Sequence, residues 1–389
     1  MRSLLLLLVT VFASTSHALD LGIDVLRDRD FDVLRGKKVG LVTNQTGTDK
    51  RGTPTRTILK RALNGNLVAL FSPEHGIDGT VPAGRYVATR KDRLTGLTVH
   101  SLYGPTRKPS SAMLRGIDVL VYDMQDIGVR SYTYISTMAK CMEAAGEAGI
   151  EFVVLDRPNP LGGLRVEGPG IESRWISFVG IFPVPYVHGM SVGELAQMAN
   201  ARGWAGSRCK LTVIPMRGWS RGMTWEDTGL AWRRTSPNIP KSRSPYYYLA
   251  TGIVGSLDGV EIGTGGPTPF EYLQGPGLNG PALASRLKAT GYPGVGISAF
   301  GNGVRLNINP DAGANLTQLA VHLLLEANRA ARPSLFARYR DADSIFWKVY
   351  GSTSIRGLCE KGASAERIAA GWSGGVASFR AARQPYLLY

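Results

Sequence analysis

Glu74 is the acidic residue whose surroundings most favour chemistry. It lies in the segment Ser-Pro-Glu-His-Gly, directly after an apolar run. Pro73 fixes the backbone before it and Gly76 permits a sharp turn after it, so Glu74 and His75 are expected to lie on one tight turn. A carboxyl group held at a strand end among apolar neighbours can act as a general acid, and His75 could orient it or bind substrate. A purely structural role, capping the next segment, is the alternative for Glu74.

A second polar cluster follows the apolar run 119–122. It contains Asp123 and Asp126, then Arg130 and Tyr132. Carboxylates bind sugar hydroxyls, tyrosine rings stack on sugar faces, and arginine pairs with carboxylates. The mixed charges suit a site for an acidic sugar. An aspartate–arginine ion pair that only stabilises the fold is the alternative.

Metal, nucleotide and serine-nucleophile chemistry find less support in the sequence. Glu74, His75, Asp123 and His188 could bind a metal ion, but nothing in their spacing requires one. The first apolar run leads into Thr-Asn-Gln-Thr-Gly rather than a glycine-rich phosphate loop, and no GxSxG segment occurs. We therefore expect no metal and no cofactor.

The N-terminal half alternates strand-like and helix-like segments. Strand-like apolar runs occupy residues 39–44, 67–71, 99–103, 119–122 and 152–155. Helix-compatible sequence lies at 55–63 and 135–145, the second ending at Gly149. Continuous apolar strands joined by helices predict an α/β fold with a Rossmann-like, mostly parallel sheet.

Four of these runs end in polar clusters, which lie at 43–46, 72–75, 123–126 and 156–159. Open α/β sheets bind ligands at the carboxyl ends of their strands. The four clusters are therefore expected to converge on one site.

The C-terminal half mixes helices and strands. Ser191 and Glu194 form a capping box that starts a helix, and the strongest helical pattern covers 316–328. Strand-like runs lie at 211–214 and 304–308. We expect residues 19–190 to form a Rossmann-like domain carrying most of the site. Residues 191–389 are expected to form a smaller α/β domain that closes the cleft.

Residues 1–18 have the pattern of a signal peptide. Arg2 precedes an apolar stretch of ten residues, and Ser16-His17-Ala18 resembles a cleavage site. The stretch is too short to span a bilayer, although an uncleaved anchor is the alternative. We expect a mature protein that is exported to the periplasm or the extracellular space and has no membrane span.

The chain carries a formal net charge of +15 and three cysteines. The charge favours anionic partners. An exported chain without a nucleic-acid-binding motif is a poor candidate for nucleic acid, and an anionic cell-wall glycan fits better. Arginine as an ordinary surface residue is the alternative. Three cysteines permit one disulfide at most and form no disulfide framework.

Eight ordered motifs, covering nearly the whole mature chain, together resemble one family, the NamZ-type exo-β-N-acetylmuramidases. They are GLVTNQTG at 40–47, SPEHG at 72–76, YDMQDIGVRSYTY at 122–134, LDRPNPLGG at 155–163, VEGPGIE at 166–172, HGMSVGELA at 188–196, SPNIP at 236–240 and PFEYLQGP at 269–276. The resemblance implies a Rossmann-like domain, a smaller second domain and a cleft between them. It also implies release of N-acetylmuramic acid from the non-reducing ends of peptidoglycan fragments.

The resemblance further implies site residues. The family's catalytic glutamate falls on Glu74. Its ligand-contacting positions fall on Asn44, His75, Asp123, Arg130, Tyr132, Asn159, His188 and Asn238. Asp123 or Asp126 is our candidate for the second catalytic group, and the acetamido group of the substrate is the alternative.

Two positions depart from the family pattern. Asp78 and Thr264 stand where the family usually has basic residues. If the missing arginine binds the lactyl carboxylate, another sugar could be preferred. An exo-β-N-acetylglucosaminidase and a non-catalytic muropeptide-binding protein are therefore the alternative functions.

Overall fold

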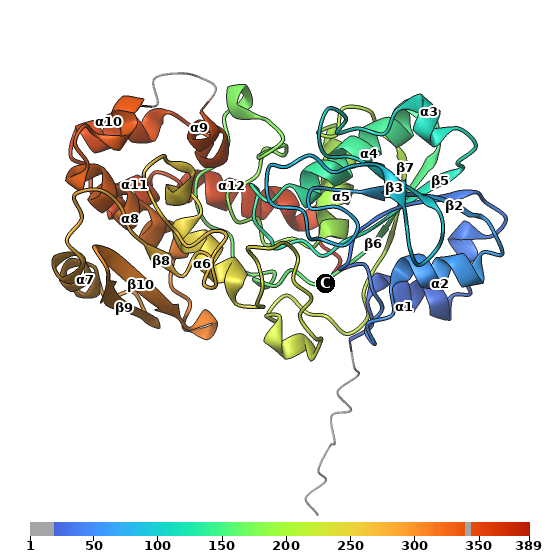
Figure 1. The fold of residues 1–389 in the computed structure, drawn as a ribbon, viewed down its shortest axis with the longest axis horizontal. Helices are drawn as coiled ribbons and strands as arrows, with labels where there is room; N and C mark the ends of the chain where they lie inside the picture. Colours follow the sequence, from blue (N-terminus) through green and yellow to red (C-terminus); the bar gives the residue numbers. More distant parts are fainter. Residues whose placement is uncertain (1–18, 339–343) are drawn as a thin grey trace, which may run out of the picture.

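The computed structural model describes residues 19–338 and 344–389, which form two lobes (Figure 1). The proposed signal peptide, residues 1–18, lies outside the described residues. Within the described part of the chain, no helix is long and apolar enough to cross a membrane.

The first lobe is built on a seven-stranded sheet with the order β3-β4-β2-β1-β5-β6-β7. Its strands are β1 (Val39–Thr43), β2 (Leu67–Ser72), β3 (Arg90–Lys91), β4 (Thr98–Ser101), β5 (Val119–Asp123), β6 (Glu151–Leu155) and β7 (Lys210–Ile214). All neighbouring strands pair in parallel except β3 with β4. The predicted α/β class with a mostly parallel sheet is confirmed.

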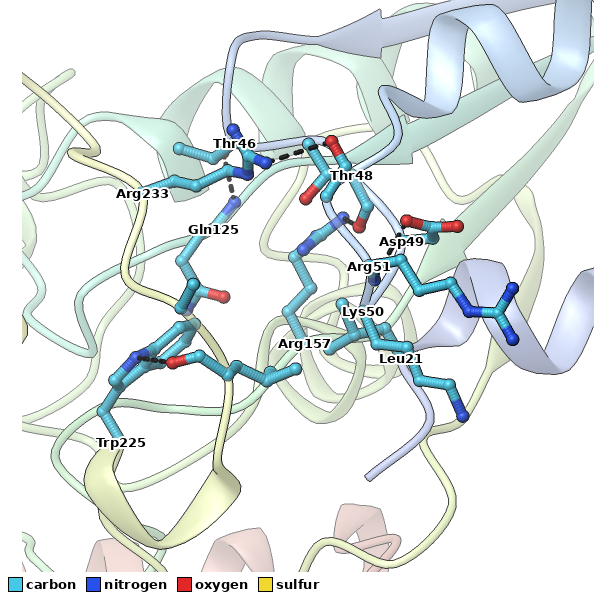
Figure 2. Close-up of a pocket in the computed structure, with 13 residues that line it drawn as sticks. Leu21, Thr46, Thr48, Asp49, Lys50, Arg51, Gln125, Arg157, Trp225 and Arg233 are labelled. Carbon is cyan, nitrogen blue, oxygen red and sulfur yellow. Dashed lines mark hydrogen bonds between the residues drawn. The ribbon is translucent and has the colours of Figure 1, made fainter. Parts of the chain in front are cut away.

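The chain changes direction across this sheet at β1. From β1 it runs to β2 and β4 on one side, and it then returns to β5 and β6 on the other. The segments that follow β1, β5 and β6 meet at the carboxyl edge of the sheet, around a small pocket (Figure 2).

Both faces of the sheet are buried, because its central strands are apolar at almost every position. Val42, Phe71 and Tyr122 point to one face, whereas Leu41 and Val121 point to the other. Helices cover each face: α1 and α2 pack on one, and α4 and α5 on the other. This explains why the strands read as continuous apolar runs rather than as alternating ones.

The helices begin and end largely where local sequence signals place them. In the first lobe they are α1 (Gly22–Asp28), α2 (Thr55–Ala62), α3 (Ser111–Leu114), α4 (Tyr134–Ala148) and α5 (Val192–Arg202). Gly149 ends α4 in the left-handed conformation, with a φ of 67°. The predicted capping box of Ser191 and Glu194 begins α5.

The second lobe contains a three-stranded antiparallel sheet with the order β8-β10-β9. Its strands are β8 (Tyr272–Leu273), β9 (Val295–Phe300) and β10 (Gly303–Ile308). The helices are α6 (Ser244–Thr251), α7 (Gly280–Ala289), α8 (Leu316–Ala330), α9 (Ile345–Tyr350), α10 (Ser354–Glu360), α11 (Ala365–Ala370) and α12 (Ser373–Arg383).

The first lobe extends past residue 190, where we expected it to end. We assigned α5 and β7 to the second domain, but β7 pairs in parallel with β6 and completes the first sheet. The strand-like run at 211–214 gave no indication of its partner, because pairing between distant segments is not encoded in the run itself.

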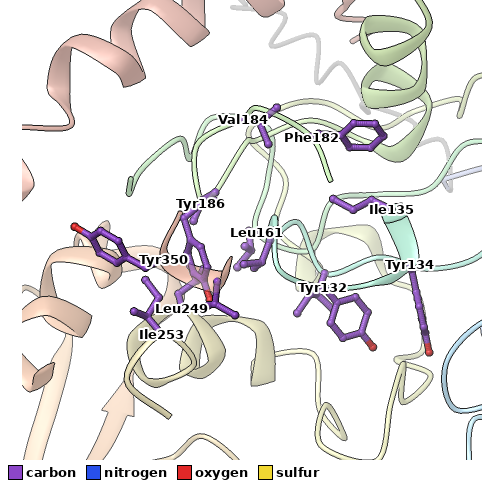
Figure 3. Close-up of a cluster of buried hydrophobic side chains, with 14 of the residues drawn as sticks. Tyr132, Tyr134, Ile135, Leu161, Phe182, Val184, Tyr186, Leu249, Ile253 and Tyr350 are labelled. Atoms are coloured by element: carbon purple, nitrogen blue, oxygen red, sulfur yellow. The ribbon is translucent and has the colours of Figure 1, made fainter. Parts of the chain in front are cut away.

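The two lobes share a hydrophobic core and are also joined by the end of the chain. One buried cluster includes Tyr134 and Phe182 together with Leu249 and Tyr350 (Figure 3). Helix α12 lies between the lobes (Figure 1), and after it the Tyr389 hydroxyl donates a hydrogen bond to Asp156 of the first lobe, at 2.7 Å. The lobes therefore form a continuous structure.

The three cysteines are free thiols, and Cys141 and Cys209 are buried.

Candidate active site

A cavity of about 350 Å³ contains the proposed acid Glu74 in its wall. The first lobe contributes Glu74, His75 and Tyr132, and later segments contribute Asn238 and Phe270. Four of the residues predicted from the sequence (Glu74, His75, Tyr132 and Asn238) are therefore brought together here.

Glu74 is held by hydrogen bonds to both carboxylate oxygens. The amide of Gly84 donates to Oε1 at 2.9 Å, and the Thr133 hydroxyl donates to Oε2 at 2.7 Å. Burial raises the pKa of Tyr103. The negative charge of Glu74 and a hydrogen bond between Tyr103 and Glu74 raise that pKa further. The carboxyl group thus has polar neighbours and a fixed orientation, in place of the apolar surroundings that we expected.

The turn that carries Glu74 is tight, as predicted. His75 adopts a φ of 70° and Gly76 a φ of 77°. This left-handed conformation is unfavourable for a residue with a Cβ atom, so the surrounding contacts must hold His75 in place. One such contact joins Nδ1 of His75 to the Val81 carbonyl, at 2.7 Å.

Aromatic rings form another part of the cavity wall. Tyr248 and Phe270 pack edge to face with ring centroids 4.8 Å apart. The Tyr132 hydroxyl donates to Oγ1 of Thr235 at 2.9 Å. Rings fixed in this way present apolar surfaces of the kind that pack against the faces of sugars.

Among the described residues that line the cavity, Glu74 is the only carboxylate, and none is lysine or arginine. Thr264, which stands where the family usually has arginine, lies in this wall. Asn238 accepts a hydrogen bond from the amide of the neighbouring Gly265, at 2.8 Å. A substrate would therefore meet one acid, hydroxyl and amide groups, and the imidazole of His75.

Asp123 and Asn44 lie outside this cavity. One oxygen of Asp123 accepts from Nε of Arg157 and the other from the Thr55 hydroxyl, both at 2.5 Å. Asn44 accepts from the amide and the hydroxyl of Thr46 through its Oδ1. Both side chains, which we expected to contact substrate, instead stabilise the segments after β1 and β5.

Asp126 is buried near the aromatic wall but does not line the cavity. Its Oδ1 accepts from the Gly128 amide at 2.7 Å, and its Oδ2 has no hydrogen-bond partner among the described residues. Burial raises the pKa of Asp126 to about 7. Its charge adds to burial in raising the pKa of Tyr132.

Arg130 is completely buried and binds backbone carbonyls rather than the cavity. Nη1 donates to the carbonyls of Pro169 and Val184, and Nη2 to those of Val349 and Tyr350, all at 2.7–2.9 Å. Burial lowers the pKa of Arg130 to about 10. The structure therefore gives this residue a structural role, because four acceptors already occupy the donors that we assigned to substrate.

Asn159 and His188 also lie away from the cavity. Asn159 donates to the Met190 carbonyl and accepts from the Leu161 amide. His188 accepts from the Met190 amide. Burial, followed by the charges of Arg383 and Arg130, lowers the pKa of His188 to about 3.

Sequence reasoning missed Tyr103, Thr133 and Tyr248, all of which line the cavity. A signal existed for Tyr103, which ends the predicted strand 99–103, the one strand whose end we left out of the polar clusters. Thr133 lay inside the YDMQDIGVRSYTY motif. Tyr248 gave no such signal, because it lies in a different lobe.

Within the described residues, no group of three histidine, cysteine, aspartate or glutamate side chains is arranged to hold a metal ion.

Comparison with known proteins matches the chain to two family models. Residues 39–243 match the N-terminal part, and residues 246–389 the C-terminal part, of the exo-β-N-acetylmuramidase NamZ. The chain is 37% identical over 381 residues to the peptidoglycan β-N-acetylmuramidase NamZ of Bacillus subtilis, covering 95% of this chain and 91% of that protein.

Two crystal structures of DUF1343 family proteins from Bacteroides fragilis are similar to it. One has a TM-score of 0.87 at 40% identity, and the other 0.69 at 28% identity. Each comparison covers 96% of this chain and 99% of the other. The resemblance seen in the motifs is thus confirmed, and the chain belongs to the NamZ exo-β-N-acetylmuramidase family.

Proposed function

We propose that this protein is a glycoside hydrolase that releases N-acetylmuramic acid from the non-reducing ends of peptidoglycan fragments. The observation that carries the proposal is the position of Glu74, fixed by Gly84 and Thr133 in the wall of a sugar-sized cavity. Membership of the family and similarity to the Bacillus subtilis enzyme support it.

In this proposal Glu74 protonates the oxygen of the leaving group. A general acid contributes about 10²–10⁴ in rate. Glu74→Gln should therefore reduce hydrolysis of a fragment with an unactivated leaving sugar by about that factor. The control variant Glu147→Gln, at a half-exposed surface position, should leave the rate of hydrolysis unchanged. Full activity of the Glu74→Gln variant would remove this residue from the acid role.

We infer that the substrate, and not the protein, supplies the second catalytic group. The cavity wall holds no second carboxylate among the described residues, and both oxygens of Asp123 are occupied. We propose that the acetamido group of the substrate acts as the nucleophile, as it does in substrate-assisted glycosidases. A glycoside with a free amine in place of the acetamido group should then not react, whereas the Asp126→Asn variant should retain activity. Hydrolysis of the free-amine glycoside together with loss of activity in Asp126→Asn would favour Asp126 as the second group.

We propose Arg107, which lies beside the cavity and not in its lining, as the cation that binds the lactyl carboxylate. Its guanidinium lies 4.5 Å from the ring centroid of Phe178 and 5.6 Å from that of Tyr103, which lines the cavity. It forms no ion pair with a described residue. Arg107→Gln should lower kcat/KM for a chromogenic N-acetylmuramic acid glycoside about tenfold, the factor for 1.4 kcal/mol.

The matching N-acetylglucosamine glycoside lacks the carboxylate and provides the control. Its turnover should not change in the Arg107→Gln variant. Faster turnover of this glycoside by the unaltered protein would favour the N-acetylglucosaminidase alternative, and binding without turnover of either would favour a binding protein.

We also propose that the protein is exported, on the basis of the signal-peptide pattern in residues 1–18. Mass spectrometry of protein recovered from the producing cell's envelope or medium should find an N-terminus near Leu19. An intact Met1 in that material would contradict cleavage.

A further inference from the structure

A second pocket, distinct from the cavity around Glu74, lies where the sheet changes direction. It has a volume of about 80 Å³ and lies against the segments that follow β1, β5 and β6 (Figure 2). Open α/β sheets place their ligands in the crevice at this point of the topology. Here Glu74, after β2, lines the neighbouring cavity and not this crevice.

The floor of this pocket contains a buried cation and an unpartnered acceptor. Arg157 donates Nε to Asp123 and Nη2 to the Thr48 carbonyl, which leaves Nη1 without a protein acceptor among the described residues. Gln125 is 3% exposed, and its Nε2 donates to the carbonyls of Asp126 and Pro158. These bonds fix the amide, yet Oε1 of Gln125 has no partner among the described residues. A buried acceptor without a donor is destabilising, so a ligand that donates a hydrogen bond to it is favoured.

The rim of the pocket is basic. Arg51 and Arg233 are exposed and form no ion pair with a described residue. The acidic member of the lining, Asp49, is neutralised by Arg27, which donates to its Oδ2 at 2.9 Å. Trp225 and Leu230 provide an apolar wall. The pocket therefore combines an anion-attracting entrance with a floor that needs a hydrogen-bond donor.

We propose that this pocket binds a small carboxylate that carries a hydroxyl or ammonium group next to it. The carboxylate would pair with Arg157 and the rim arginines, and the adjacent donor would satisfy Oε1 of Gln125. A volume of about 80 Å³ has room for only a few non-hydrogen atoms, which limits the ligand to about the size of 2-hydroxy and 2-amino acids of three carbons.

The pocket and the catalytic cavity share one wall. Arg233 lines the pocket, and Ser236 and Asn238 line the cavity. Between them, the carbonyls of Arg234 and Thr235 accept hydrogen bonds from Nε2 of Gln45, after β1. The site is thus separate from the proposed chemistry but adjacent to it.

Calorimetric titration with lactate and with alanine tests the proposal without any turnover, so its outcome does not depend on the hydrolase assignment. Propionate keeps the carboxylate but lacks the donor, and lactamide keeps the donor but lacks the charge. We expect lactate or alanine to bind about tenfold or more tightly than either control, a difference of at least 1.4 kcal/mol. No binding of lactate or alanine at millimolar concentration, or equal binding of propionate, would overturn the proposal.

Variants locate the binding. Arg51→Glu combined with Arg233→Glu should weaken it about tenfold or more, whereas the matched pair Arg61→Glu and Arg115→Glu, at exposed positions elsewhere, should not. Gln125→Glu should weaken the binding of lactate more than that of alanine, because the new negative charge repels the carboxylate of both ligands but attracts the ammonium group of alanine. Unchanged binding in the rim double variant would place the ligand elsewhere and overturn the assignment.

Discussion

The hydrogen bond between Thr133 and Glu74 can be tested by substitution. Thr133 precedes α4, yet its hydroxyl does not cap that helix and instead donates to Oε2 of Glu74. A hydrogen bond to a charged group is worth about 1.5–3 kcal/mol. The orientation of the proposed acid therefore depends on this hydroxyl group as well as on the Gly84 amide.

Thr133→Val should lower kcat about tenfold or more, because the isosteric side chain fills the same space but cannot donate. Thr133→Ser keeps the hydroxyl and should retain most of the activity. Steady-state kinetics on both variants, with circular dichroism to check folding, provides the measurement. Equal activity of the valine and serine variants would contradict a positioning role.

Asp126 should make folding less favourable as the pH rises. Burial raises its pKa to about 7, whereas an unfolded aspartate has a pKa of about 3.9. Between these values the folded protein holds the proton and the unfolded chain does not, so stability falls with rising pH. Asp126→Asn removes this effect. Relative to the unaltered protein, its free energy of unfolding should increase from about pH 4 to about pH 7 and then level off.

Urea titrations at a series of pH values measure this difference. His188 has the opposite effect in both proteins, because its lowered pKa makes stability fall as the pH decreases, so only the difference between the two proteins is informative. A difference that does not change with pH would show that Asp126 is not buried as the structure places it.

At the scale of elements, the sequence predicted most strands of the first sheet and the long helices α4, α5 and α8, because apolar periodicity and caps are local signals, but it missed most of the short helices and strands of the second lobe. The strands β1, β2, β5 and β6 lie where the apolar runs predicted them, and α8 covers the predicted helix 316–328. The partner of β7 and the partial convergence of the polar clusters were not predictable. Both depend on contacts between distant segments, such as that between Asp123 and Arg157.

Residues at strand ends can either face a ligand or hold the loops that follow, and the sequence does not distinguish the two uses. Glu74 and His75 line the cavity, whereas Asn44 and Asn159 hold the loops that follow their strands. Loops need such side chains, because their backbone groups lack the partners that a sheet provides.

The connector between residues 160 and 190 depends on Arg130, which joins it to the end of α9. Arg130→Gln should lower the free energy of unfolding by at least about 2 kcal/mol, because a shorter side chain leaves several buried carbonyls unpaired. The ratio of activities on N-acetylmuramic acid and N-acetylglucosamine glycosides should stay the same. Denaturant unfolding and the two glycoside assays test this, with Arg115→Gln as an exposed control. A loss of activity on the N-acetylmuramic acid glycoside alone would indicate that Arg130 binds substrate.

At the scale of the whole molecule, the end of α12 and the segment after it attach the second lobe to the first. Arg383 donates to the carbonyls of His188 and Gly189, and the hydroxyl of Tyr389 lies between Asp156 and the amide of Met216. Asp156 is fully buried, and its Oδ2 accepts from only two side chains, the hydroxyls of Tyr389 and Ser191, so the loss of one of them is costly.

Tyr389→Phe should reduce the free energy of unfolding by about 1–3 kcal/mol. Tyr386→Phe is a suitable control, because the hydroxyl of that partly exposed tyrosine makes no hydrogen bond to a described residue. Thermal and chemical denaturation of both variants measure the effect. Equal stability of the two would show that the contact with Asp156 contributes nothing.

The wall formed by residues 233–239 has a thermodynamic consequence, because it faces the small pocket on one side and the sugar cavity on the other. Any shift of this wall that a guest in one compartment favours also alters the shape of the other compartment. Linkage is reciprocal: if a ligand in the small pocket changes the affinity for the sugar by some factor, the sugar changes the affinity for that ligand by the same factor. Binding of the proposed small acid and binding of the sugar would then be linked through this one short stretch of chain.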